Sequence, residues 1–258
     1  MNTTDYTKAQ GHWVLARMGK KVLRPGGKEL THQLVRSLEI TTEDHIAEFA
    51  PGLGFTASIS LKNMPFSYVG IDANQEAIRY LKQKVTGRNV EFIEGNAAST
   101  PLTAGSKDKV YGEAMLTMHA DHRKSEIIKE AHRILKKGGL YAIHELGLTP
   151  NDLSEDMKAT IQKDLALAIK VNARPLTEAE WITLLESEGF RIRKTERNTM
   201  HLLEPSRIID DEGVFRALKI GLKLLTNPGA RKRIIHMRKT FKKHQQHMNA
   251  IVIIAEKI

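Results

Sequence analysis

The sequence contains no cysteine among its 258 residues, which excludes disulfides, thiolate metal sites and iron–sulfur clusters. Radical chemistry that begins at a cysteine-bound cluster is excluded for the same reason. Long hydrophobic runs are also missing, since no stretch approaches the roughly 18 apolar residues of a membrane-spanning helix. The first ten residues, MNTTDYTKAQ, lack the apolar core of a secretory signal peptide. We therefore expect a cytoplasmic protein.

Acidic residues are scarce near the C-terminus, where residues 228–258 contain eight Lys or Arg and the single acid Glu256. The whole chain has a formal net charge of +10. A basic region of this kind attracts nucleic acid, an anionic lipid surface or an acidic substrate. A solvated helix face carries such charge more often, so the charge alone assigns no partner.

Residues 44–146 alternate short apolar segments with amphipathic ones. Strands are expected at 44–50, 67–71, 90–93, 109–115 and 140–146, with helices between them. Strands that alternate with helices imply crossover connections and a mostly parallel sheet with helices on both faces. The helix before the fifth strand is expected to end at Lys136-Lys137-Gly138-Gly139, because basic residues followed by glycine are typical of a helix C-terminus.

The C-terminal part adds helices and two further strands, one that begins at 190–192 and one at 251–255, which makes seven strands in all. Thr177 and Glu180 form a capping-box pattern that opens one of these helices. We predict an N-terminal helical lid segment at 1–40 and a main domain at 41–258. Within that domain, a helical insertion at 204–243 is a candidate lid or dimer element.

The central local motif is EFAPGLG, residues 48–54, which lies between the first strand and the helix after it. Gly52 and Gly54 let the backbone turn tightly and let a ligand approach without meeting a Cβ. Asp72 ends the second strand, 18 residues after Gly54. An acid there accepts hydrogen bonds from the ribose of an adenosine cofactor or caps the following helix. The two features together fit a nicotinamide cofactor as well as S-adenosylmethionine (SAM).

Residues 44–146 resemble the class I SAM-dependent methyltransferases, especially the small-molecule branch that includes ubiquinone and menaquinone C-methyltransferases. Glu48, Gly52 and Gly54 match the first motif of the family, and Asp72 matches its ribose-binding acid. The segment 94–98 resembles the adenine-binding segment, with Asn96 where the family commonly has Asp. Residues 131–140, AHRILKKGGL, resemble the late helix–turn–strand signature. Departures from the first motif occur at two positions, Ala50 and Pro51.

This resemblance implies a Rossmann-like α/β fold, a methyltransferase domain and SAM as the cofactor. Arg24 and the Gly26-Gly27 turn, with residues 11–13, are expected to cover the methionine end of SAM, although an ordinary helix-ending turn fits them equally. The resemblance also implies a set of cofactor-binding residues: Glu48, Ala50, Pro51, Gly52, Gly54, Thr56, Asp72, Ala73, Asn96, Ala97, Ala98, Glu113 and Met115.

Glu113 and His119 are the predicted catalytic residues, because methyl transfer in the family takes place past the fourth strand. Glu113 would pair with the ammonium group of the cofactor or take a proton from the acceptor. His119 would act as a base, since its unperturbed pKa lies near neutrality. A partly exposed loop residue explains His119 as well. The histidines lack a familiar metal-ligand spacing, so no metal is predicted.

The sequence therefore predicts a SAM-dependent methyltransferase that acts on a small, partly apolar acceptor by in-line displacement. The alternative is a methyltransferase of RNA or other nucleic acid that uses the basic C-terminal region. The Asn/Asp-Pro-Pro-Tyr/Phe motif of amino-methylating enzymes is absent, which argues against methylation of base amino groups. An NAD-dependent oxidoreductase and a non-catalytic SAM-fold protein are further hypotheses. Candidate partners also include an anionic membrane surface and a second copy of the chain.

Overall fold

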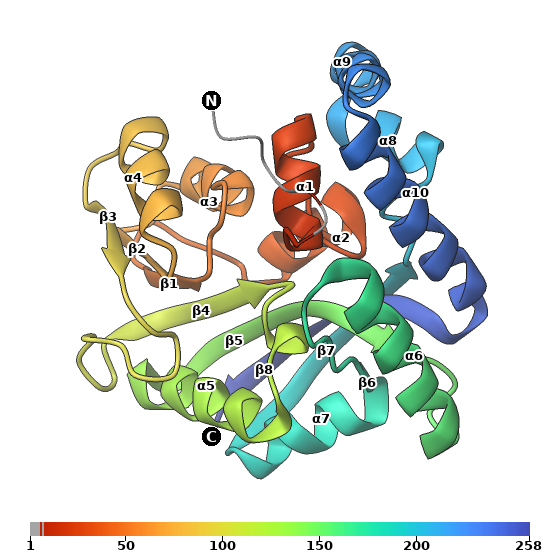
Figure 1. Ribbon diagram of the computed structural model, residues 1–258. Coiled ribbons are helices and arrows are strands. Elements are labelled where there is room, and N and C mark those ends of the chain that lie inside the picture. The colour runs from red at the N-terminus through yellow and green to blue at the C-terminus, as the bar shows by residue number, and fades with distance from the viewer. Residues whose placement is uncertain (1–5, 7) are drawn as a thin grey trace.

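A computed structural model describes residue 6 and residues 8–258, and an open sheet crosses its centre (Figure 1). The sheet order is β3-β2-β1-β4-β5-β8-β7. The short strand β6 lies off this path and pairs with the end of β5. Neighbours from β3 to β5 are parallel, and β8 runs antiparallel to both β5 and β7. The predicted mostly parallel seven-stranded α/β sheet is confirmed, with β6 as an addition. The strands are β1 (His45–Phe49), β2 (Ser67–Asp72), β3 (Val90–Glu94), β4 (Lys107–Glu113), β5 (Leu135–Leu148), β6 (Leu176–Thr177), β7 (Phe190–Thr199) and β8 (Met248–Lys257).

Helices cover both faces of the sheet and one end of it (Figure 1). On one face α2, α3 and α4 pack over apolar residues such as Ile46 and Val252, and on the other face α5 and α7 pack over Phe49 and Ile253. A third apolar cluster joins α1, α6 and α10 to the end of β5. The helices are α1 (Gly11–Met18), α2 (Gly27–Ser37), α3 (Phe55–Ser60), α4 (Gln75–Lys84), α5 (Asp121–Ile134), α6 (Glu155–Ile169), α7 (Glu178–Ser187), α8 (Pro205–Glu212), α9 (Val214–Thr226) and α10 (Pro228–Lys243).

The junction of α5 and β5 differs from the prediction. The helix ends at Ile134, and the segment predicted as its C-terminus is already part of β5. The last helical carbonyls accept hydrogen bonds from the amides of Gly105 and Ser106, at 3.0 and 2.8 Å, so a glycine cap is unnecessary. Gly138, with φ of 76°, instead lies where the register between β4 and β5 shifts.

Three other predicted segments differ in detail from the structure. β7 begins at Phe190, as predicted, and continues to Thr199 through charged, largely exposed residues that hid the rest of the strand pattern. The helix predicted over 206–225 breaks at Gly213, which has φ of 79°. Within the predicted 1–40 lid, α2 packs against the sheet through Leu30 and Leu34, and the residues of this segment that line the cleft lie at α1 and in the loop after it; residues 1–5 and 7 are outside the described part. Over the described residues, no helix is long and apolar enough to cross a membrane.

Candidate active site

A cleft of about 570 Å³ lies beside the carboxyl ends of β1, β2 and β4. This is the edge at which open α/β sheets bind ligands, and the volume falls in the range of small-molecule sites. The N-terminal part also contributes, through Gln10, His12, Trp13 and Leu23. Eight of the predicted site residues line the cleft together: Ala50, Asp72, Ala73, Asn96, Ala97, Glu113, Met115 and His119.

The glycine turn shapes one edge of this cleft. Ala50, Gly52 and Gly54 all have positive φ, of 53°, 58° and 75°. A Cβ on Gly54 would lie 2.7 Å from Leu81 Cδ2, so this glycine allows α4 to pack against the turn. A Cβ on Gly52 would have Ala50 O, at 3.9 Å, as its nearest described neighbour, which leaves room for a ligand. Pro51, Gly52 and Gly54 form the turn without being part of the cleft lining.

Asp72 is positioned by the glycine turn and by the helix after β2. Its carboxylate accepts hydrogen bonds from the amides of Gly52, at 3.2 Å, and Asn74, at 2.9 Å. Burial raises the pKa of Asp72, and these two amides oppose that effect. The N-cap of α4 is Asn74, whose side chain accepts from the amides of Glu76 and Ala77. Asp72 is therefore not needed as the cap, and it lines the cleft.

Asn96 makes contacts that the sequence did not predict. Its Oδ1 accepts hydrogen bonds from Arg123 Nη2 at 2.6 Å and from the amide of Ala98 at 3.0 Å. These bonds occupy both lone pairs of the carbonyl that was expected to meet the adenine amino group. The Asn96 side chain lies at the cleft, but this contact would require Arg123 to move. Ala98 itself lies just outside the cleft lining and serves to hold Asn96.

Glu48 lies away from the cleft, contrary to its predicted contact with the cofactor. Its Oε2 accepts from the Tyr68 hydroxyl at 2.5 Å and lies 2.9 Å from the Tyr111 hydroxyl. Successive strand side chains point to opposite faces, and Glu48 shares the face of β1 on which α2 and α3 pack. Burial raises the pKa of Glu48 to about 7 against the opposing hydrogen bond from Tyr68. The buried Glu48 side chain therefore stabilises the sheet beneath α3 through its hydrogen bonds with the two tyrosines.

Glu113, at the end of β4, is surrounded by donors. Thr31 Oγ1 donates to its Oε2 at 2.7 Å, the Thr56 hydroxyl donates to Oε1, and Arg24 Nε lies 3.4 Å from Oε1. Burial alone would raise the pKa of Glu113, but the charge of Arg24 and the hydrogen bonds from His144 and Thr56 lower it to about 2. A carboxylate in this state is ionised and is a weak base. Thr56, predicted to bind the cofactor, donates its hydrogen bond to Glu113 instead and is connected to the cleft through that carboxylate.

A loop over the site, residues 19–26, is held by buried acids at the end of α8. Glu212 Oε1 accepts from the amides of Lys21, at 2.7 Å, and Val22, at 2.8 Å. Asp211 accepts from Lys20 Nζ at 3.3 Å and from the amide of Lys28 at 2.9 Å. These contacts fix both ends of the loop that carries Arg24 towards Glu113.

Two histidines line the cleft. His119 follows the short 3-10 turn at 116–118; burial and the positive charges of Arg123 and Lys124 lower its pKa, so the ring is neutral at pH 7. His12, on α1, was not predicted as a functional residue. Burial lowers its pKa as well. Both rings are thus in the form that accepts a proton. In the described part of the chain, no group of three or more His, Asp or Glu side chains is arranged to hold a metal ion.

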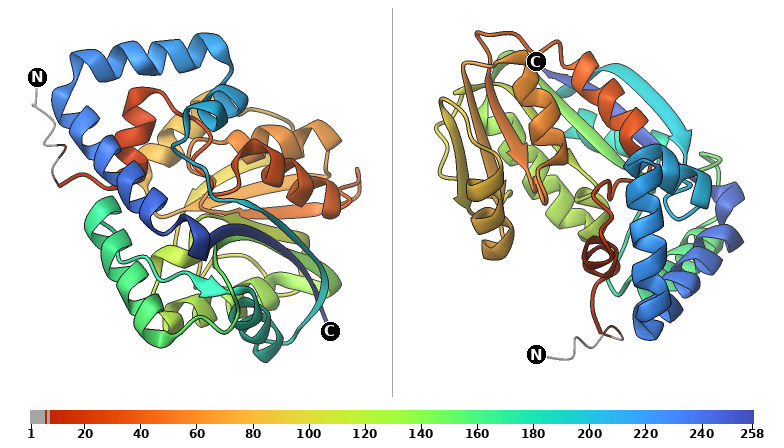
Figure 2. Two further views of the ribbon diagram at one scale, coloured as in Figure 1. Left: turned by 90° about the vertical axis from the view of Figure 1, so that its right-hand side faces the viewer. Right: turned by 90° about the horizontal axis from the view of Figure 1, so that it is seen from above.

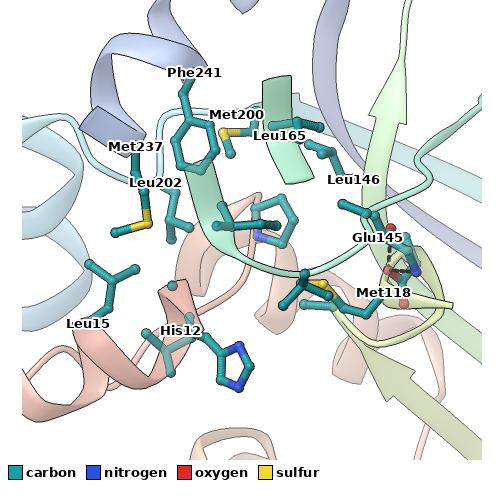
Figure 3. Close-up of a pocket in the computed structure, with 18 residues that line it drawn as sticks. His12, Leu15, Met118, Glu145, Leu146, Leu165, Met200, Leu202, Met237 and Phe241 are labelled. Carbon is teal, nitrogen blue, oxygen red and sulfur yellow. Dashed lines mark hydrogen bonds between the residues drawn. The ribbon is translucent and has the colours of Figure 1, made fainter. Parts of the chain in front are cut away.

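A second, apolar cavity of about 80 Å³ adjoins the cleft (Figure 3). His12, Leu23, Ala114 and Met118 line both spaces, so the cleft and the cavity share a wall. Sequence reasoning missed most of the cavity, because its residues come from segments far apart in the chain and none carries a motif. The labelled residues in Figure 3 are His12, Leu15, Met118, Glu145, Leu146, Leu165, Met200, Leu202, Met237 and Phe241.

Glu145 holds the turn that separates the two spaces. Its Oε1 accepts from the amides of Met115 and Leu116, at 2.9 and 2.8 Å, and its Oε2 accepts from the amide and hydroxyl of Thr117, at 3.0 and 2.7 Å. Burial raises the pKa of Glu145, and these four bonds oppose the effect. The buried carboxylate thereby fixes Met115 on the cleft side and Met118 at the shared wall.

A methyltransferase domain model matches residues 47–143, the segment that builds this cleft. An uncharacterized protein of Haemophilus influenzae is 32% identical over 96% of this chain and 98% of its own length. An uncharacterized methyltransferase of Synechocystis is 29% identical over 70% of this chain and 83% of its length. The chain belongs to the class I SAM-dependent methyltransferases. A sterol 24-C-methyltransferase of Aspergillus fumigatus, 25% identical, matches 64% of this chain and 44% of its own length.

Solved structures agree with this methyltransferase fold. A [4+2]-cyclase superposes with a TM-score of 0.73 over 98% of this chain and 96% of the cyclase, at 13% sequence identity. A geranyl diphosphate methyltransferase in complex with SAM superposes with a TM-score of 0.66 over 89% of this chain and 85% of that enzyme, at 11% identity. At such low identity these likenesses show the fold alone.

Proposed function

We propose that this methyltransferase transfers the methyl group of SAM to a small, partly apolar acceptor that occupies the apolar cavity. The observation that carries the proposal is the wall shared by cleft and cavity. An acceptor lined by Leu165, Leu202 and Phe241 would reach the cleft beside Ala114 and Met118. The names of the sterol and geranyl diphosphate methyltransferases refer to acceptors with a large apolar part, which supports this class.

The cleft offers complementary groups for SAM. Asp72 supplies a carboxylate for the ribose, and the space above Gly52 admits a ligand backbone close to the turn. Glu113 lies at the cleft as an ionised carboxylate whose two oxygens already accept from Arg24, Thr56, Thr31 and His144, which suits it to hold the surrounding segments rather than to abstract a proton. We therefore assign Glu113 to positioning, and the predicted role as a base passes to a histidine.

Bound SAM supplies a methyl group on a sulfonium, which is an activated leaving group. Transfer forms the acceptor–methyl bond, breaks the sulfur–methyl bond and releases S-adenosylhomocysteine; a protonated acceptor also loses one proton. His12 lies at the junction of cleft and cavity and His119 lies in the cleft, both with lowered pKa. We propose that His12 accepts this proton, because His12 lines both the cleft and the cavity. The apolar walls exclude water and align the acceptor.

Calorimetric titration with SAM, S-adenosylhomocysteine and NADH tests the cofactor assignment. Binding of the two adenosyl ligands without NADH supports it, and binding of NADH alone would contradict it. The acceptor site is tested with Leu202→Phe, which fills the cavity, against Leu203→Phe, a buried neighbour outside its lining. We expect Leu202→Phe to raise the acceptor KM about tenfold while the SAM Kd stays unchanged. Equal effects of the two variants on KM would overturn the cavity assignment.

Nucleic acid is the second candidate acceptor, because residues 213–243 contain many basic side chains and no acid. Binding of RNA through Lys and Arg falls steeply with rising salt. Methylation of transfer RNA or ribosomal RNA by the purified protein, with a steep dependence on salt, would favour this candidate over the small molecule.

A further inference from the structure

The helix α9 presents an apolar face to solvent. At about 100° of rotation per residue, five of its apolar side chains fall within one arc of about 100°. Isolated exposed apolar residues are common, but a contiguous stripe marks an interaction surface. The exposed fractions are 58% for Val214, 91% for Phe215, 62% for Leu218, 65% for Leu222 and 66% for Leu225.

The opposite face of α9 fixes its orientation on the molecule. Ile220 is buried in a cluster with Val14 and Met18 of α1 and Ala230 of α10. The helix lies at the outer edge of the fold, where α10 returns from it towards the sheet (Figures 1 and 2). The apolar stripe is therefore held outward by packing on its other side.

The surroundings of the stripe are strongly basic. Residues 213–243 contain ten Lys or Arg and no Asp or Glu. Lys219, Lys223, Arg231, Lys232 and Lys239 are exposed, and none of them forms a salt bridge within the described residues. An apolar stripe flanked by unpaired cations combines the two features by which interfacial helices bind anionic lipid.

We propose that α9 and the first turns of α10 form a docking surface for an anionic membrane. Phe215, Leu218 and Leu222 enter the boundary between head groups and acyl chains, and Lys219 and Lys232 contact the lipid phosphates. A second copy of the chain fits less well, because this face would bring the exposed cations that form no salt bridge in the described part of the chain, such as Lys219 and Lys232, against the same cations of the other copy. Nucleic acid would pair with the cations but would leave the apolar stripe in water.

Docking at this surface places the acceptor cavity close to the membrane. Met237 and Phe241 of α10 and Leu15 of α1 line the cavity, and the same two helices support α9. Access of a lipid-soluble acceptor from the membrane rests on the proposed function. Docking on the membrane does not rest on the proposed function, so docking and acceptor access are tested separately.

The test is cosedimentation of the whole chain with vesicles of phosphatidylcholine, with or without about 30% phosphatidylglycerol. We expect binding only to the anionic vesicles, reduced by about 0.5 M NaCl. Phe215→Ser with Leu222→Ser should lower the partition coefficient at least about tenfold. Lys219→Glu with Lys232→Glu should do the same. All four side chains are exposed, so the fold should be unaffected, and calorimetric SAM binding checks this.

Matched control variants separate the surface from general effects. Phe66→Ser changes a side chain that is 56% exposed at the start of β2, far from α9, and Lys82→Glu changes an exposed cation on α4. Both should bind vesicles like the parent. Absence of vesicle binding by the parent, or equal loss in control and stripe variants, overturns the proposal. Two further outcomes also overturn the proposal. One is a dimer, detected by light scattering, that Phe215→Ser dissociates. The other is RNA that competes with vesicles for the protein and loses binding when the stripe is substituted.

Discussion

His144 Nδ1 lies 2.6 Å from Glu113 Oε2, and both side chains are almost fully buried. The other ring nitrogen, Nε2, accepts a hydrogen bond from the amide of Gly26 at 3.2 Å. Since Nε2 accepts, the proton of the neutral ring resides on Nδ1 and is donated to the carboxylate. One tautomer of His144 thus connects β4 and β5 to the loop that carries Arg24.

Replacement of His144 by Phe should loosen this connection. The change leaves the Gly26 amide without its acceptor and removes one donor from Glu113; each such buried loss costs about 1–3 kcal/mol. We expect the free energy of unfolding in urea to fall by about 2–4 kcal/mol. The SAM Kd should rise, because Arg24 and Gly26 are released together. His45→Phe, at the amino end of β1, is the control; equal SAM binding by the two variants would refute the connection.

The low pKa of Glu113 predicts how stability depends on acid. A fall in pKa from 4.5 to about 2 corresponds to about 3 kcal/mol at about 1.4 kcal/mol per pH unit. Because the folded-state pKa is depressed, this contribution is complete above about pH 4.5 and is lost as the pH falls towards 2. Urea unfolding of the parent and Glu113→Gln should therefore differ most at pH 6 and converge at low pH. A difference that is constant with pH would show that the carboxylate is not charged in the folded protein.

Glu48 should make the free energy of unfolding depend on pH in the opposite sense to Glu113. Burial raises its pKa from 4.5 to about 7, so the folded state favours the protonated form. The associated stability is complete below about pH 4.5 and is lost as the pH rises through 7, a change of about 3 kcal/mol. Glu48→Gln keeps an oxygen for the Tyr68 hydroxyl and cannot ionise. We expect the variant to be more stable than the parent at pH 8 and similar at pH 5, as measured by urea unfolding.

The sheet and the glycine turn could be predicted because local patterns determine them. Strand-like segments that alternate with helical ones predicted a mostly parallel sheet, and Asp72 ends its strand as expected. Local patterns do not reveal which face of a strand a charged residue occupies when both faces are buried, so Glu48 was misplaced. The contact of Asn96 with Arg123 joins positions 27 residues apart, and the cavity joins α1, α6 and α10. Contacts of this kind depend on tertiary packing.

Asp72→Ala should weaken SAM binding by about 1.5–3 kcal/mol, the range for hydrogen bonds to a charged group. This corresponds to a rise in Kd of roughly ten- to hundredfold. Glu76→Ala, an exposed acid in the first turn of α4, is the matched control and should leave Kd unchanged. Calorimetric titration at one salt concentration measures both. Normal SAM binding by Asp72→Ala would remove the ribose assignment.

Glu212 provides the most distant test of the site, since its carboxylate lies on α8 and contacts the loop through the amides of Lys21 and Val22 and through Lys20 Nζ, 4.0 Å from Oε1. Glu212→Gln keeps one oxygen that can accept from Lys21 and Val22 but removes the charge that strengthens both bonds. Glu212→Ala removes the acceptor and leaves two amides unpaired. We expect SAM Kd to rise in the order parent, Gln variant, Ala variant, with the Ala variant raised at least about tenfold. Glu204→Ala, which removes a partly exposed partner of Arg238, is the control. If Glu212→Ala lost stability in urea but bound SAM like the control, Asp211, Glu113 and His144 would position the loop without Glu212.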